Sequence, residues 1–131
     1  MTLEPLEKLA INELLVRYSH NADFEPPESM RDLFTRDAVF DVPAMGLSFT
    51  GVDAIIAFFH SARETKPGVR HVISNIVVEG ARDSATSCAY LQILEQNEGR
   101  WQCVGFGRYQ DKLSRGSDGR WRFAHRHIVL G

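Results

Sequence analysis

The sequence predicts an α+β fold, in which N-terminal helices pack on a strongly curved, mostly antiparallel sheet that forms a cone with an internal pocket. Two patterns carry this prediction. In the first half of the chain, apolar residues recur at steps of three and four, which is typical of amphipathic helices. From residue 70 onward, apolar and polar residues alternate in four long stretches separated by turn-forming residues, which is typical of an antiparallel meander.

Three helices are expected in the first half. The first covers residues 3–22 and cannot continue through Pro26 and Pro27, because proline lacks the N–H that a helix needs. A short second helix is expected at residues 29–35, and a third at residues 51–65. The apolar stripe of the first helix consists of Leu6, Leu9, Ala10, Leu14 and Tyr18, widened by Ile11 and Leu15.

The remaining apolar stretches are predicted strands. Gly105 and Gly107 lie inside one of the longest, where glycine indicates strong curvature or the close approach of a neighbouring backbone. A curved sheet with helices across its concave side leaves a cone-shaped interior, and apolar walls with a few polar groups are the usual setting of a small-molecule site. The strands are expected at residues 38–42, 47–49, 70–79, 86–96, 100–113 and 120–130.

Length and composition describe one domain, expected to cover residues 1–131. The formal charge of −2 and the pI near 6.2 argue against a nucleic-acid surface, which needs a basic excess. No stretch approaches the ~20 apolar residues of a membrane span, and the acidic N-terminus lacks the apolar run of a signal peptide.

Cys88 and Cys103 are an odd number of positions apart and are expected on opposite faces of a hairpin, without a disulfide. We therefore expect a soluble, cytoplasmic protein.

His71 and Asp23 are the candidate functional pair. His71 places an ionisable imidazole at the start of an otherwise apolar strand, and Asp23 lies in the polar end of the first helix. An imidazole titrates near neutrality and can act as a base if one ring nitrogen is free and the tautomer is fixed. A carboxylate on the other nitrogen fixes the tautomer and stabilises the imidazolium that forms. The hypothesis is that the two side chains meet at the bottom of an apolar pocket.

Each of these residues also has a purely structural interpretation. His71 can be a structural histidine, Asp23 can simply end a helix, and Tyr18 can belong to the core. Asn75 shares a strand face with His71 if no bulge intervenes. It then either lines the pocket or satisfies a carbonyl at the sheet edge.

His125 and His127 are a second histidine pair, two positions apart on the last strand, so their imidazoles share a face and can bind a metal ion. The sequence shows no third ligand and leaves the direction of Asp41 open, so no metal is expected. Gly105-Phe106-Gly107 lies inside a strand with no following helix and is not a phosphate loop. Serine nucleophile elbows are absent as well. The expected chemistry is cofactor-free.

Several longer motifs carry a resemblance to a known family. They are Leu33-Phe34-Thr35-Arg36-Asp37-Ala38-Val39-Phe40, a helix opened by Gly51, Arg70-His71, Gly107-Arg108-Tyr109-Gln110-Asp111 and Gly119-Arg120-Trp121-Arg122-Phe123-Ala124-His125-Arg126. In this order, and over nearly the whole chain, they resemble the SnoaL-like group of the nuclear transport factor 2-like superfamily. The resemblance implies the same cone-shaped α+β fold.

The resemblance also implies roles for particular residues. Scytalone dehydratase, lindane dehydrochlorinase and the bile-acid 7α-dehydratases belong to that superfamily and use a histidine–aspartate dyad, which His71 and Asp23 match. Tyr18 matches a tyrosine five positions before the aspartate in the bile-acid enzymes. An arginine near the end of the C-terminal strand corresponds to Arg126, unless His127 occupies that place in the pocket. These lyases are trimers and many SnoaL-like proteins are dimers, so a homo-oligomer of either kind is expected.

The function implied by the resemblance is that of a cofactor-independent lyase, a dehydratase, acting on a small hydrophobic cyclic or polyketide-like substrate. His71 would remove a proton beside a carbonyl before a β-leaving group departs. Tyr18 would donate a proton or hydrogen bond, and Arg126 would hold an anionic region. Two alternatives stay open: an isomerase similar to the ketosteroid isomerases, with Tyr109 and Asp111 on its strand, and a non-catalytic small-molecule-binding or assembly domain on the same fold.

Overall fold

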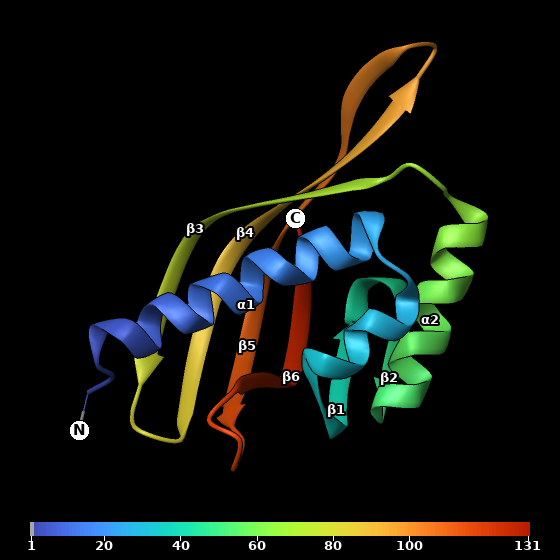
Figure 1. Cartoon of the computed structure of the whole chain (residues 1–131). Helices are drawn as coiled ribbons and strands as arrows, with labels where there is room; N and C mark the ends of the chain where they lie inside the picture. The colour runs from blue at the N-terminus through green and yellow to red at the C-terminus, as the bar shows by residue number, and fades with distance from the viewer. Residues whose placement is uncertain (1) are drawn as a thin grey trace.

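The computed structural model describes residues 2–131 and places two long helices over one face of a six-stranded sheet (Figure 1). Met1 of the expected domain lies outside the described residues. The helices are α1 (Pro5–Phe24), the 3₁₀ helix η1 (Pro27–Asp32), the 3₁₀ turn η2 (Pro43–Met45) and α2 (Val52–Thr65). The strands are β1 (Phe34–Val42), β2 (Leu47–Thr50), β3 (Arg70–Gly80), β4 (Ser84–Asn97), β5 (Arg100–Arg115) and β6 (Trp121–Leu130).

The sheet is open and has the strand order β2-β1-β6-β5-β4-β3. Every neighbouring pair is antiparallel except β1 and β6, which run parallel. The parallel pair brings distant parts of the chain together, since Phe40 lies opposite Arg126 and Asp41 lies opposite His127. The predicted α+β class with a mostly antiparallel sheet is confirmed.

The core between the helices and the covered face of the sheet is dominated by aromatic rings. Tyr18 of α1 is 1% exposed. Its ring packs against four others, with centroid distances from 5.7 to 6.2 Å. These rings belong to Phe34, Phe59, Tyr109 and Phe123, which come from β1, α2, β5 and β6.

The buried face of α1 is rotated relative to the predicted stripe. Leu6 and Leu9, expected inside, are 78% and 64% exposed, and Ala10 is exposed as well. The predicted and the observed faces both follow three- and four-residue steps, so spacing alone does not choose between them. The buried residues of α1 are Ile11, Leu14, Leu15, Tyr18, Ser19 and Asn21.

The second predicted helix is shorter than expected, because the chain turns into a strand at Phe34. The helix η1 ends at Asp32, and β1 covers residues that were expected to lie in the helix and in a loop. The Phe123 backbone N–H donates to the Leu33 carbonyl at 2.8 Å, so pairing with β6 begins there. Pairing with a strand from the far end of the chain therefore overrides the local helical pattern.

Bulges bend the sheet, and one glycine allows two of its strands to approach closely. A side chain at Gly107 of β5 would place its Cβ 2.6 Å from the Val129 carbonyl oxygen of β6, which confirms the predicted close backbone approach. Bulges increase local twist and bend a strand. The ladder shifts register between Ser74 and Val77, between Ile93 and Leu94, and between Lys112 and Leu113.

The face of the sheet that the helices leave uncovered carries exposed apolar residues. Tyr90 and Phe106 are 43% and 46% exposed, and their ring centroids lie 5.7 Å apart. Association between copies of the chain would cover such a patch. The homo-oligomer stays a prediction.

The Cys88 and Cys103 thiols are free and exposed. Within residues 2–131, no helix combines the length and the apolar character needed to cross a bilayer.

Candidate active site

The end of α1 and the start of β3 bring Asp23 and His71 into direct contact. The His71 Nδ1 atom lies 2.7 Å from Asp23 Oδ1. The His71 backbone N–H also donates to the two carboxylate oxygens, at 3.2 and 3.0 Å. The Asp23 side chain is 6% exposed and the His71 side chain 22% exposed. The Asp23 carboxylate is thus bound by both the ring and the backbone N–H of His71.

This contact decides which nitrogen of His71 is available for chemistry. With Nδ1–H donating to the carboxylate, the lone pair of the neutral ring lies on Nε2. Within residues 2–131, Nε2 forms no hydrogen bond. The pair therefore has the arrangement of a base whose tautomer is set by a carboxylate.

Arg63 of α2 holds the end of α1 that presents Asp23. Its guanidinium donates to the carbonyl oxygens of Asn21 at 3.1 Å and Ala22 at 2.6 Å, and to that of Glu25. A cation at a helix C-terminus is favourable, whereas a carboxylate such as Asp23 is not. Arg63 therefore both fixes the helix end and offsets the local excess of negative charge.

Arg126 of β6 is fully buried among aromatic rings. Its guanidinium carbon lies 4.2 Å from the ring centroid of Tyr18, 3.4 Å from that of Tyr109 and 4.3 Å from that of Phe123. Its Nε atom lies 3.0 Å from Asp111 Oδ1, and Nη2 donates to Oδ2 at 3.4 Å. The buried cation is therefore compensated by one carboxylate and by stacking on three rings.

Asp111 of β5 belongs to this internal ion pair. Its side chain is 0% exposed, and Oδ2 also accepts a hydrogen bond from the Ser87 hydroxyl at 2.9 Å. Burial raises the pKa of Asp111 above its ordinary value, while Arg126 and Ser87 lower it. Because the carboxylate is already engaged by these partners, it has the environment of a structural ion pair rather than of a base facing a ligand.

Tyr18 and Tyr109 are both buried beside the Arg126–Asp111 ion pair. Burial raises the pKa of Tyr18 well above its ordinary value. Burial also raises the pKa of Tyr109 to about 12, with the charges of Asp111 and Asp23 acting in the same direction and Arg126 opposing. Both phenols are therefore protonated at neutral pH, so they can donate hydrogen bonds but cannot act as bases.

Asn75 lies outside the interior, contrary to the expected pocket position. A bulge interrupts β3 between Ser74 and Val77, and Asn75 within it is exposed, with a φ of +56°. The expectation required an unbroken strand. The bulge breaks the alternation that would have placed Asn75 on the face of His71.

His127 also lies outside the interior. It follows Arg126 on β6 and points to the opposite face of the sheet. There its Nδ1 atom lies 2.5 Å from Asp41 Oδ1. Of the two candidates for the arginine position, only Arg126 is directed into the interior.

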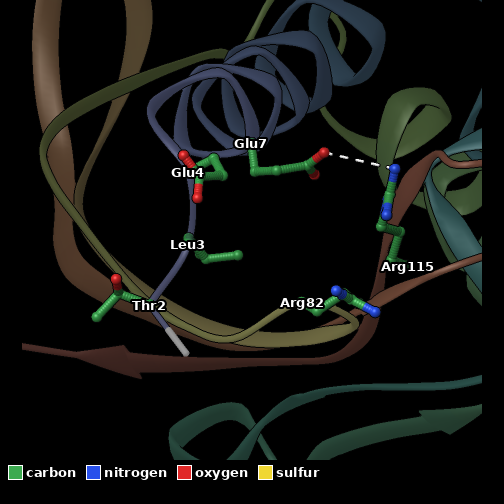
Figure 2. Close-up of a pocket in the computed structure, with 6 residues that line it drawn as sticks. All are labelled: Thr2, Leu3, Glu4, Glu7, Arg82 and Arg115. Atoms are coloured by element: carbon green, nitrogen blue, oxygen red, sulfur yellow. Dashed lines mark ion pairs between the residues drawn. The ribbon is translucent and has the colours of Figure 1, made fainter.

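Two surface hollows lie away from the Asp23–His71 pair. One is at the start of α1, where Glu7 and Arg115 form an ion pair with a 3.5 Å contact (Figure 2). The other is lined by residues at the β3–β4 turn and on β5. Neither includes Asp23 or His71, so the enclosed apolar pocket above His71 stays a prediction.

Arg63 and Ser87 complete the arrangement but were not identified from the sequence. Ser87 lies directly opposite Asp111 in the β4–β5 pairing, so an accurate strand register was the signal that could have found it. Arg63 leaves no comparable signal. Its partners are backbone carbonyls of another helix, and backbone carbonyls carry no sequence pattern.

The fold and the site together define a class of protein: a small α+β domain whose helices and open sheet surround a buried layer of polar and aromatic groups. The chain belongs to the SnoaL-like domain family, whose model matches residues 4–127. This confirms the resemblance recognised in the sequence. No curated protein sequence matches the chain.

Solved structures show the same fold. A protein of unknown function with a cystatin-like fold, from Nostoc punctiforme, is 26% identical with a TM-score of 0.88; the match covers 100% of this chain and 96% of that one. A protein proposed to be an aromatic ring hydroxylase, from Novosphingobium aromaticivorans, is 30% identical with a TM-score of 0.81, covering 98% and 92% of the two chains. A protein from the same organism, proposed to be a scytalone dehydratase, is 24% identical with a TM-score of 0.80, covering 96% and 85%.

Proposed function

We propose that this chain is a cofactor-independent lyase, a dehydratase that removes a proton beside a carbonyl group with His71 as the base. The observation that carries the proposal is the contact between Asp23 Oδ1 and His71 Nδ1 at 2.7 Å. A carboxylate in this position leaves Nε2 as the basic atom and stabilises the imidazolium formed when that atom takes a proton.

The proposed reaction breaks two bonds of a β-hydroxy carbonyl substrate. His71 Nε2 takes the proton on the carbon beside the carbonyl, and the electron pair forms a carbon–carbon double bond as the β-hydroxyl leaves. The proton on His71 then passes to the leaving oxygen, so that water is released and the neutral base is restored. General base catalysis of this kind contributes about 10²–10⁴-fold.

Tyr18 and Arg126 are assigned to the carbonyl oxygen of the substrate. The raised pKa of Tyr18 keeps its hydroxyl protonated, so that it serves as a hydrogen-bond donor to the oxygen on which negative charge develops. Arg126, 4.2 Å from the Tyr18 ring centroid, favours that charge electrostatically. Because Arg126 is paired with Asp111, Arg126 stabilises this negative charge less than a free cation would.

The proposed substrate is a small hydrophobic cyclic or polyketide-like compound. Four aromatic rings pack against Tyr18, and His71 lies opposite Ile93 in the β3–β4 pairing. These neighbours favour an apolar ring over a charged metabolite. One structure of similar fold, 30% identical to this chain, comes from a protein proposed to be an aromatic ring hydroxylase.

The test is a turnover screen with a panel of cyclic β-hydroxy ketones. Formation of the conjugated enone is followed by its ultraviolet absorbance, for the wild-type chain and for His71→Ala and Asp23→Asn. His71→Ala is expected to lower kcat/KM by about 10²–10⁴-fold. Asp23→Asn keeps the shape of the side chain but removes its charge, and is expected to lower kcat/KM at least about 10-fold.

His60→Ala is the matched control. His60 is also a histidine paired with a carboxylate, since its Nε2 atom lies 2.6 Å from Glu28 Oε1, but the pair is on the surface. Its replacement is expected to leave turnover unchanged. Equal turnover by the wild type and His71→Ala would remove His71 from the role of base.

A non-catalytic binding domain is the second candidate, favoured by one observation. Asp23 accepts hydrogen bonds from the His71 backbone as well as from its ring, and a backbone bond of this kind is what a purely structural connection between α1 and β3 needs. In that case the same compounds would raise the melting temperature without being converted. His71→Ala would then keep the ligand-induced rise.

A further inference from the structure

Three potential metal ligands converge on the face of the sheet opposite the proposed active site. Asp41 comes from β1, and His125 and His127 come from β6. One ligand atom from each lies within 4.8 Å of the other two. The cluster has no part in the proposed dehydration, because Arg126 lies between the two histidines in the sequence and points through to the other face.

The strand geometry explains why these three side chains meet. His125 and His127 are two positions apart on a strand, so both imidazoles stand on one face. The parallel pairing of β1 and β6 then sets Asp41 directly opposite His127. Asp41 is the third ligand that the sequence alone did not show.

The contacts within the cluster place the carboxylate between the two rings. Asp41 Oδ2 lies 3.1 Å from His125 Nε2, and Asp41 Oδ1 lies 2.5 Å from His127 Nδ1. The side chains are 33%, 20% and 32% exposed for His125, Asp41 and His127, in that order. The three ligand atoms are therefore already close together, and the cluster is partly open to solvent.

We propose that Asp41, His125 and His127 bind a divalent transition-metal ion of the zinc class. Two imidazoles and one carboxylate form a donor set preferred by Zn²⁺ and Ni²⁺ over Mg²⁺ and Ca²⁺, which favour oxygen ligands. Metal–ligand bonds of about 2.0–2.2 Å in a tetrahedral site require donors about 3.3–3.6 Å apart. To reach that spacing, these partly exposed side chains have to rotate so that His127 Nδ1 and Asp41 Oδ1 move apart from 2.5 Å, and the fourth position remains for water.

The neighbours of the cluster on the same face allow a cation to bind. Ser48 lies opposite Asp41, and Gln110 lies opposite His127. Both are neutral and carry oxygen atoms. Lys112 lies opposite His125 and is the one positive neighbour in this pairing; its exposed, flexible side chain can extend into solvent.

The test is a titration of the purified full chain with Zn²⁺, after dialysis against a chelator. It uses a background with Cys88→Ser and Cys103→Ser, because both thiols are exposed and cysteine thiolates are zinc ligands. Isothermal titration calorimetry is expected to show one ion per chain, with little heat from Mg²⁺. Each of Asp41→Asn, His125→Ala and His127→Ala is expected to weaken binding by more than about 10-fold.

Two further measurements keep the result independent of folding and of the proposed enzyme. Circular dichroism identifies any variant that fails to fold. Histidine ring resonances in NMR spectra of the wild type are expected to shift with Zn²⁺ at His125 and His127, but not at His20 or His60. The site is overturned if the variants bind Zn²⁺ as tightly as the background, or if the shifts occur at the other histidines. Neither result depends on whether His71 is a base.

Discussion

Replacing Asp111 with asparagine measures how much the buried ion pair between Asp111 and Arg126 contributes to the stability of the fold. Asp111 and Arg126 side chains are both 0% exposed, so the substitution leaves a buried guanidinium without its carboxylate. Removing one partner of a buried pair costs about 3–5 kcal/mol. The Nη2–Oδ2 contact is long at 3.4 Å, and three rings still stack on Arg126. We therefore expect the lower end of that range, about 3 kcal/mol of the free energy of unfolding.

Urea and thermal unfolding measure this loss. For a chain of this length, about 3 kcal/mol corresponds to a fall of roughly 10 °C in Tm. Glu13→Gln is the matched control, because Glu13 pairs with Arg17 at 3.2 Å on the surface of α1 and its side chain is 65% exposed. Exposed ion pairs contribute little, so this control is expected to leave Tm nearly unchanged.

Equal Tm values for Asp111→Asn and Glu13→Gln would refute a contribution from the buried ion pair. A double variant sharpens the test. Replacing Asp111 with leucine and Arg126 with methionine removes both charges, so it is expected to recover much of the stability lost by Asp111→Asn. If it does not recover, the loss comes from packing or from the Ser87 hydrogen bond rather than from an uncompensated charge.

Two further predictions concern α1 and the buried tyrosines. Arg63→Ala removes three hydrogen bonds to carbonyl oxygens at the end of α1. In urea unfolding it is expected to lower the free energy of unfolding by about 1–2 kcal/mol. Arg17→Ala, which breaks only an exposed ion pair on α1, is the comparison, and an equal loss in both variants would contradict this. The folded state raises the pKa of Tyr109 from 10.0 to about 12, so the unfolded state binds fewer protons in that window and stability falls as pH rises through it. In a Tyr90→Phe background, phenolate absorbance from Tyr18 and Tyr109 is expected to appear together with unfolding, and its appearance in the folded chain near pH 10 would contradict their burial.

The fold class was predictable from local patterns: three- and four-residue steps in the first half of the chain and alternation after residue 70. The Asp23–His71 contact was a hypothesis that rested on the chemistry of the two residues and on the resemblance to the histidine–aspartate lyases. The prolines after Asp23 place this residue at the end of α1. Its 2.7 Å contact with His71 depends on how α1 crosses the sheet, which local patterns do not specify.

Residues that depend on contacts between distant segments could not be predicted. Arg63 binds carbonyls of another helix, and Asp41 meets His127 only because β1 and β6 pair in parallel across most of the chain. Hairpin rules relate neighbouring strands and say nothing about such a pair. The rotation of the buried face of α1 has the same origin. Two faces of this helix follow the same three- and four-residue steps, and only packing against the sheet decides which of them is buried.

One bulge in β6 explains both the error about His127 and the separation of the two sites. Leu113 pairs with Phe123 and Lys112 pairs with His125, so Ala124 is an extra residue in the ladder. Strict alternation from the buried Phe123 would point His125 and His127 inward and Arg126 outward. The extra residue reverses this order from His125 onward. The interior therefore receives the arginine that pairs with Asp111, and the two histidines stand on the outer face beside Asp41, where a metal ion can reach them from solvent.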